Sequence, residues 1–291
     1  MPKKSSLFLR LLLFAALLLF ALFFPDRSLT VRVFLFGAAT LGLSFFLSVC
    51  REACLCSASF LGIGALTAAL ISHGNLHPFS LFSAFLGSVL FSSLIALLVG
   101  SFLLRLEGDL FSLGSFCFSE ALRVVLEGLP FAGGARGCDL ACWEPMPLSA
   151  FLFFLFVFLL LAFLKGSSFS LFASAVNDAP LGASAVGVFV HQVRMKGFCL
   201  MAAICGGAGF FYASVSGILL PADSAYLRSC DLLAAAVLGG ENYLVGGLFA
   251  SLLLSVGEVA FSSLAGVRLL LLAGIFLLFS LKSGKKGRMG L

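Results

Sequence analysis

Charged residues are scarce in this sequence. Of 291 residues, 18 are Lys or Arg and 13 are Asp or Glu, together 11% of the chain. A soluble domain carries about a quarter charged residues. Hydrophobic residues instead make up 61%, with Phe alone occurring 35 times. A soluble core could not bury so much apolar surface, so the bilayer must be the solvent for most of the chain.

The signatures of catalysis and metal binding are also missing. The sequence has no GxxxxGK[ST] phosphate loop, no HExxH and no GxSxG. Its nine Cys form no CxxC pair and show no zinc spacing. His73 and His77 are four residues apart, but the intervening Gly74 and Asn75 indicate a loop. We therefore expect no catalytic residue, no metal site, no cofactor and, since the basic residues lie at the ends of apolar runs, no nucleic-acid partner.

Long apolar runs dominate instead and predict transmembrane helices. The expected spans are 7–24, 30–49, 58–72, 80–104, 110–127, 148–165, 197–217 and 265–282. A further apolar region, 231–258, is interrupted by Gly239, Gly240, Glu241 and Asn242. Each half is too short to cross the hydrocarbon, so this region is expected to be a broken or re-entrant helix. The sequence predicts a single all-α domain over 1–291, with about 8–10 transmembrane helices.

The distribution of Lys and Arg predicts the orientation. With the N-terminus inside, the cytoplasmic set is Lys3, Lys4, Arg10, Arg51, Arg105, Lys165, Arg194, Lys196, Lys282, Lys285, Lys286 and Arg288. The outer set is Arg27, Arg32, Arg136, Arg228 and Arg268. Both termini and the segment 176–196 are then cytoplasmic, in a multi-pass protein of the cell (inner) membrane. The largest outer loop is 129–147, where Cys138 and Cys142 either form a disulfide or remain free thiols.

Three charged residues fall within one expected span. Glu120, Arg123 and Glu127 lie on one helical face, where Glu120 and Arg123 can pair. Such residues either line a pathway or gate, or form a structural ion pair near the outer interface. Glu127 lies close to the outer end of the span, which favours the structural ion pair.

Glycines form a further pattern. Gly62 and Gly64, the group Gly206, Gly207 and Gly209, and the pair Gly239–Gly240 permit close helix approach or local unwinding. Packing is the simpler interpretation for the group around Gly207. The polar residues after Gly240 favour a helix break there.

The segment 176–196 is unlike the rest of the chain. It reads VNDAPLGASAVGVFVHQVRMK, which is polar at both ends and rich in small residues. It is too polar for a good span and too helix-like for a simple connector. We therefore expect a cytoplasmic surface helix that contacts a partner.

Five segments together resemble the LivM-type permease subunit of branched-chain amino-acid ABC importers. They are SASFLGIGALTAALI (57–71), LLRLEGDLFSLGSFCFSEALRVVL (103–126), AGGARG (132–137), SSFSLFASAVNDAPLGASAVGVFVHQVRMKGF (167–198) and AAAVLGGENYLVGGLFAS (234–251). Their order and spacing match the family from about Phe34 onward. CREACLC (50–56) departs from it by inserting Arg51 and Glu52 and losing glycines, and the chain has Asn177, Asp178, Ala179 and Pro180 where the family has an Arg followed by acidic residues.

The resemblance implies a type II-like ABC importer permease without its own ATP site. Its implied partners are cytoplasmic ABC ATPase subunits, a second, LivH-like permease subunit, an extracytoplasmic solute-binding protein and membrane lipid. A coupling helix around 179–188 would contact the ATPase, with Ala183 and Gly187 at the family's small positions. The implied coupling residues are Asp178, Ala179, Leu181, Ala183, Val186 and Gly187. Pathway or helix-break candidates are Phe60, Gly62, Gly64, Glu120, Arg123, Gly239, Gly240 and Asn242.

Two other functions remain as alternatives. An ion-coupled secondary transporter would use Glu120, Glu258 or the break at 239–242. A membrane enzyme would need paired catalytic residues within the spans, and the sequence offers only His73, His77 and His191. The expected cargo is a branched-chain amino acid; other amino acids, amides, urea, nucleosides and sugars are open alternatives, because specificity resides largely in the binding protein.

Overall fold

The structure is a computed structural model that describes residues 27–72, 78–106, 108–129, 134–136, 138–139 and 147–238. The first helices are α2 (Arg27–Cys50), α3 (Ser57–Ser72), α4 (Pro78–Leu103) and α5 (Asp109–Gly128). The outer connection holds η2 (Gly134–Arg136) and β1 (Cys138–Asp139). Then follow α6 (Pro147–Gly166), α7 (Ser168–Asp178), α8 (Pro180–Ala185), α9 (Val190–Ser216), β2 (Ile218–Leu219), η3 (Pro221–Ser224) and α10 (Tyr226–Leu238).

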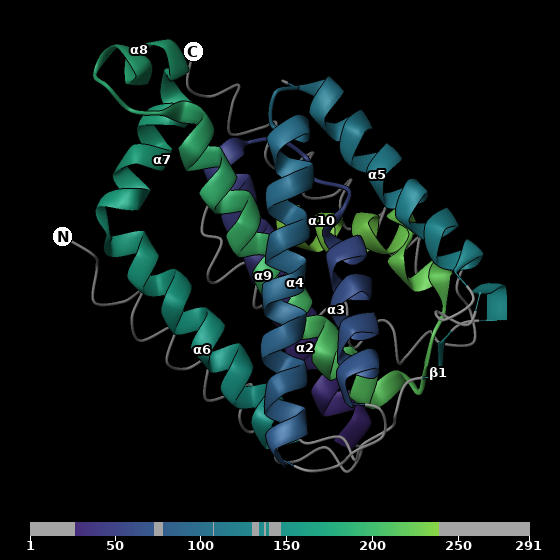
Figure 1. Cartoon of the computed structure of the whole chain (residues 1–291). Helices are drawn as coiled ribbons and strands as arrows, with labels where there is room; N and C mark the ends of the chain where they lie inside the picture. Colours follow the sequence, from purple (N-terminus) through teal and green to yellow (C-terminus); the bar gives the residue numbers. More distant parts are fainter. Residues whose placement is uncertain are drawn as a thin grey trace.

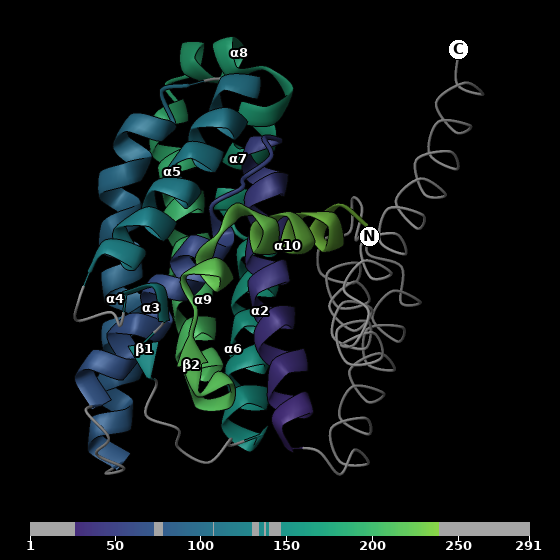
Figure 2. The same ribbon diagram turned by 90° about the vertical axis from the view of Figure 1, so that its right-hand side faces the viewer.

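The long helices form a bundle with α8 at one end (Figure 1). Helices α2, α4, α6 and α9 run along the bundle, and α5 crosses its side obliquely. Figure 2 shows that α10 lies crosswise to α2 near the middle of the bundle, while β2 lies toward the end opposite α8. The small antiparallel ladder pairs Cys138 with Leu219 and Asp139 with Ile218.

Among the described residues, four helices are long and apolar enough to cross a membrane: Thr30–Cys50, Phe79–Leu103, Pro147–Gly166 and Val190–Ser216. They confirm the all-α, multi-pass prediction and four of the expected spans. The expected spans 58–72 and 110–127 are the helices α3 and α5, but α3 is shorter and α5 carries more charge than the four. The spans 7–24 and 265–282 lie outside the described residues.

The core lies where α2, α3 and α9 meet. Phe198 of α9 packs edge-on against Phe46 of α2, with ring centroids 5.6 Å apart, and against Phe60 of α3 at 5.5 Å. Helices α4 and α6 instead leave large apolar side chains such as Phe102 and Phe163 exposed. In a membrane protein this outer surface faces lipid, so exposed apolar side chains there are expected.

Glycines bring α3, α9 and α4 into backbone contact. A Cβ at Gly64 would overlap the carbonyl of Gly206, and a Cβ at Gly209 would overlap the carbonyl of Leu61. Gly206 also lies so close to Ser92 of α4 that a side chain would not fit. The packing interpretation of the group around Gly207 is therefore confirmed, and it extends to Gly64.

The chain is irregular after α9. Helix α9 ends at Ser216, the φ of 69° at the following Gly217 suits glycine, and the chain then turns inward through β2 and η3. Ser224 of η3 reaches α3, where a Cβ at Gly62 would overlap its hydroxyl. Of the region 231–258 expected to be broken, only 231–238 is described, and it belongs to the crosswise helix α10.

Candidate functional site: the α8 end and its polar interior

The segment 176–196 is not one surface helix. Helix α7 ends at Asp178, α8 occupies Pro180–Ala185, and α9 begins at Val190, seven residues before the expected start at 197. The extended Ala179 (φ −153°) separates α7 from α8. Pro180 takes the first helical position, where its missing N–H is not needed. The expected helix over 179–188 is therefore shorter: it begins at Pro180 and ends at Ala185.

A Schellman motif ends α8 at Gly187. The Val188 N–H donates to the Ala183 carbonyl at 3.0 Å, and the Gly187 N–H donates to the Ser184 carbonyl at 3.0 Å. Gly187 has φ +86°, and nothing lies within 4 Å of the position that a Cβ would take. This geometry is the usual reason for glycine after a helix. Gly187 thus fixes the turn into α9, a role that the sequence interpretation missed.

The apolar side chains around α8 point away from the protein. Leu181, Val186 and Phe189 are 86%, 85% and 72% exposed. Ala183 is instead buried in the core cluster. Of the two small residues that the family resemblance singled out, Ala183 therefore faces inward and Gly187 sets the conformation of the turn.

Two contacts hold the α8 end to α2 and to the segment that follows it. The Asn177 side-chain amide donates to the carbonyl of Ser48 in α2. Arg194 of α9 pairs with Glu52, with Nη1 and Oε1 3.4 Å apart and both side chains nearly buried. The same Glu52 oxygen accepts the N–H of Gly108, in the turn between α4 and α5. Glu52, one of the departures from the family pattern, thus joins three parts of the chain.

The connection from Glu52 to Leu55 is not helical, and neighbouring serines supply hydrogen-bond partners for it. The Leu55 N–H donates to Ser115 Oγ at 3.0 Å, and Ser112 Oγ donates to the Ala53 carbonyl at 3.0 Å. The Ala58 N–H, in the first turn of α3, donates to Ser229 Oγ of α10 at 3.0 Å. Irregular backbone inside a membrane protein is stable only when its polar groups are satisfied in this way.

A buried seam of hydroxyl groups continues along α3. Ser59 Oγ lies 2.9 Å from Ser119 Oγ of α5 and 3.1 Å from the carbonyl of Ser224. Farther along, Thr67 and Ser88 both donate to the Gly64 carbonyl at 2.9 Å. These hydroxyls pair across α3, α4, α5 and η3, whereas Ser57 Oγ and Ser224 Oγ beside them are buried without a hydrogen-bond partner among the described residues.

The intramembrane charges pair as the sequence suggests. Arg123 Nε lies 2.8 Å from Glu120 Oε2, and Nη1 of the same guanidinium binds Glu127. Glu120 is therefore not the unpaired carboxylate that ion coupling would require. The three side chains remain partly exposed on α5.

Some of the other pathway and helix-break candidates lie in α3, and the rest lie outside the described residues. Phe60, Gly62 and Gly64 lie within the continuous helix α3, so no helix break occurs at them. The break lies just before, in the connection that ends at Cys56. Gly239, Gly240 and Asn242 lie outside the described residues, as do the side chains of Asp178 and Cys138 and all of Cys142. Within the described part of the chain no group of His, Cys, Asp and Glu side chains could hold a metal ion.

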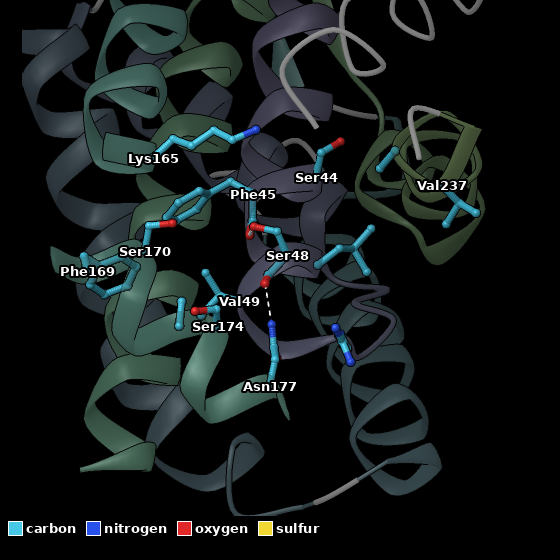
Figure 3. Close-up of a pocket in the computed structure, with 14 residues that line it drawn as sticks. Ser44, Phe45, Ser48, Val49, Lys165, Phe169, Ser170, Ser174, Asn177 and Val237 are labelled. Atoms are coloured by element: carbon cyan, nitrogen blue, oxygen red, sulfur yellow. Dashed lines mark hydrogen bonds between the residues drawn. The ribbon is translucent and has the colours of Figure 1, made fainter. Parts of the chain in front are cut away.

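A cleft of about 600 Å³ opens between α2, α7 and α10, close to the α8 end. Figure 3 shows Ser44, Phe45 and Ser48 entering it from α2, Lys165 from the end of α6, and Phe169, Ser170, Ser174 and Asn177 from α7. Arg51 and Val237 complete two of its sides. This cleft could not be predicted from the sequence, because its walls come from segments more than a hundred residues apart.

The family model described as branched-chain amino acid transport system / permease component matches residues 27–281. The chain belongs to this family. The resemblance noted in the sequence and the prediction of a permease in place of an enzyme are thereby confirmed.

Two curated relatives carry the name high-affinity branched-chain amino acid transport system permease protein LivM. The protein from Escherichia coli (strain K12) is 23% identical over 259 residues, and that from Salmonella typhimurium (strain LT2) is 24% identical over 259. Each match covers 75% of this chain and 59% of the relative. The permease thus spans about three fifths of the length of these relatives, and no solved structure matches it.

Proposed function

We propose that this chain is the membrane subunit of an ABC importer for a small polar solute, driven by separate ATPase subunits. Membership of the permease family supports this role, and the names of the two relatives make branched-chain amino acids the first cargo to test. The proposed assembly contains cytoplasmic ATPases, a second, LivH-like permease subunit and an extracytoplasmic solute-binding protein. This chain would perform no covalent chemistry.

The exposed apolar surface of Leu181, Val186 and Phe189 is the observation that carries the proposal. Leu181 lies in α8 at the end of the bundle, and Val186 and Phe189 lie in the turn after it, whose conformation Gly187 fixes. An apolar surface beyond the spans would be costly in water unless a partner covered it. We assign the ATPase contact to this surface, with Ala179 beside it; the assignment of Asp178 remains a prediction.

The charge distribution supports a cytoplasmic position for the α8 end. Arg51, Arg105, Lys165, Arg194 and Lys196 lie at the helix ends on this side, whereas Arg27 and Arg136 lie at the opposite end. Positive residues concentrate on the cytoplasmic side of membrane proteins. An ATPase that uses cytoplasmic ATP would then meet α8, and the binding protein would meet the end with β1 and β2. The same orientation places both termini in the cytoplasm, as a prediction.

We place the solute path beside the polar face of α5. Glu120 and Arg123 are the charged groups there, and each is about one quarter to one third exposed. Phe60, Gly62 and Gly64 lie behind this face in the packed interior, where they hold α3 against α9 and η3. Gly239, Gly240 and Asn242 stay predicted path residues.

Co-purification with the ATPases encoded beside this chain tests the proposal. The double variant Leu181→Ser/Val186→Ser should lose ATPase binding and solute-stimulated ATP hydrolysis. Its folding should be unchanged, because both side chains are more than four fifths exposed. Ile218→Ser, an exposed apolar position in β2 at the opposite end, is the matched control. Wild-type ATPase binding by the double variant would refute the docking assignment.

Reconstituted uptake tests the cargo separately. Uptake of leucine, isoleucine or valine into liposomes should require the complete complex, its binding protein and ATP. Uptake by this chain alone under an imposed ion gradient would instead establish the secondary-transporter alternative.

A further inference from the structure

The connection between α2 and α3 is tied to the first two turns of α5 by hydrogen bonds. The Gly108 N–H, at the start of α5, donates to Glu52 Oε1 at 3.4 Å. Ser112 Oγ donates to the Ala53 carbonyl at 3.0 Å, and a third hydrogen bond from the same connection reaches the second turn of α5. The beginning of α5 should therefore follow a movement of this connection.

Helix α5 is only lightly embedded in the bundle. Of its 20 residues, four are buried: Phe111, Ser115, Ser119 and Leu126. Two of these four are serines, whose burial stabilises less than that of a large apolar side chain. The helix crosses the side of the bundle obliquely (Figure 1) and takes no part in the glycine contacts that hold α3 against α9. A small shift of α5 therefore disturbs less packing than a shift of α3 or α9.

Glu52 is also tied to α9, at the end that follows α8. Arg194 Nη1 lies 3.4 Å from Glu52 Oε1, the oxygen that accepts the Gly108 N–H. Arg194 lies in the second turn of α9, shortly after the turn at Gly187 that joins α8 to this helix. One carboxylate oxygen therefore contacts both α9 and the start of α5.

The contact between Glu52 and Arg194 can become tighter than it is in this structure. Its 3.4 Å separation is longer than the about 2.7–2.9 Å of a close guanidinium–carboxylate hydrogen bond. Arg194 Nε is buried and has no hydrogen-bond partner among the described residues. A shift of α9 toward the connection would strengthen the pair appreciably, because both side chains are nearly buried and water screens their charges weakly. The strength of the pair therefore depends on the position of α9.

We propose that Glu52 is a positioning residue that carries a displacement of α8 and α9 to α5. This inference rests on the proposed function, in which an ATPase contacts α8 and solute passes beside the polar face of α5. When the ATPase displaces α8 and α9, the Arg194 contact tightens or loosens, and the connection at Glu52 moves the start of α5. Ion pairs and hydrogen bonds between rigid elements carry coupling of this kind. Glu52 lies in the segment where the sequence departs from the family pattern, so the link is particular to this chain.

The reactivity of Cys117 in the complete complex tests this link. Cys117 lies on α5 and is the only exposed thiol among the seven described cysteines. Its rate of alkylation by N-ethylmaleimide, followed by peptide mass spectrometry, should differ between the nucleotide-free and the vanadate-trapped complex. Glu52→Ala and Arg194→Gln should each reduce this difference about fivefold while the ATPases stay bound. Glu52→Gln keeps an acceptor for the Gly108 N–H and should retain part of the response.

Ser229→Ala is the matched control. It removes a buried hydrogen bond to the Ala58 N–H, just beyond the other end of the same connection, and does not touch the contacts of Glu52. It should lower thermal stability but leave the Cys117 response unchanged. Glu52→Ala should also lower the amount of solute taken up per ATP hydrolysed by the intact complex. A purely structural role would not change this ratio, because unfolded molecules leave the complex.

Two results would overturn the proposal. A Cys117 rate that is the same with and without trapped nucleotide in the wild-type complex would show that α5 does not respond to the ATPases. A wild-type response in Glu52→Ala would show that the response bypasses this carboxylate, and Arg194→Gln decides the same question if Glu52→Ala does not fold. Failure of the wild-type chain to bind the ATPases, seen beforehand by co-purification, would instead contradict the proposed function itself.

Discussion

Glu52 and Arg194 are 142 residues apart in the sequence and form an ion pair in which the two side chains are 10% and 13% exposed. The pair joins the connection after α2 to the second turn of α9. Because Glu52 also accepts the Gly108 N–H, it holds the α4–α5 turn in place as well. Three segments near the α8 end therefore depend on one carboxylate.

Replacing one member of the Glu52–Arg194 pair should destabilise the protein more than is expected from its share of the loss in the double variant, in which both charges are removed. Glu52→Gln or Arg194→Gln leaves a nearly buried charge without its main partner, which costs about 3 kcal/mol. The double variant should be more stable than the sum of the two losses predicts. Thermal unfolding of the purified chain in detergent would measure these effects, with Lys196→Gln as the control. Strictly additive losses would show that the two groups do not interact.

Substitution of the interhelical glycines should disrupt the contact between α3 and α9. Gly64→Ala and Gly209→Ala each place a methyl group against backbone atoms that cannot rotate away. We expect a loss of about 1–3 kcal/mol for each, typical of overpacking. Gly128→Ala is the matched control, since nothing lies within 4 Å of its Cβ position. Fluorescence-detected size-exclusion chromatography after heating would give the ranking, and equal stability of all three variants would contradict it.

The turn after α8 should depend on the conformation of Gly187 and not on its small size. Gly187→Ala forces a side chain into the left-handed region and should destabilise the turn by about 1 kcal/mol. Gly187→Asn should be better tolerated, because Asn adopts this conformation more readily. Limited proteolysis would report cleavage between Ala179 and Phe189. Gly182→Ala, within α8 at a position of ordinary φ, is the control. If the Gly182→Ala protein were cleaved as fast as the Gly187→Ala protein, the conformational role of Gly187 would be contradicted.

Neutralising Glu120 should leave transport energetics unchanged. Glu120 is paired with Arg123, which also binds Glu127, so Glu120→Gln removes one of two carboxylates from a guanidinium that keeps the other. ATP-dependent uptake in proteoliposomes should keep its requirement for ATP and its insensitivity to ionophores, whatever the effect on its rate. Acquired or lost dependence on an ion gradient would show that Glu120 takes part in coupling.

The elements made by long apolar runs could be predicted from the sequence. The spans at 30–49, 80–104 and 148–165 agree with α2, α4 and α6 within a few residues, because burial in lipid requires about twenty apolar residues. The start of α9 was missed because Val190–Lys196 is polar, although helical hydrogen bonding continues through it. The amphipathic helix α7 was missed because it is too short and too polar to resemble a span.

The site could be predicted only where its contacts are local. Glu120 and Arg123 pair because they are one helical turn apart, which the spacing indicates. The contact of Ala58 with Ser229 spans 171 residues and depends on how η3 and α10 fold back toward α3. The cleft has the same dependence on tertiary structure. Glycines are ambiguous for another reason: Gly187 and Gly64 look alike in the sequence, yet one supplies a backbone conformation and the other a close helix contact.

The glycine contact between α3 and α9 has a mechanical consequence. With no side chains between their backbones at Gly64 and Gly206, these two helices cannot slide past each other without a steric clash. Helix α9 has 27 residues and is therefore about 40 Å long. A tilt of α9 would therefore also displace α3 and, through the contact of Gly62 with Ser224, the turn η3.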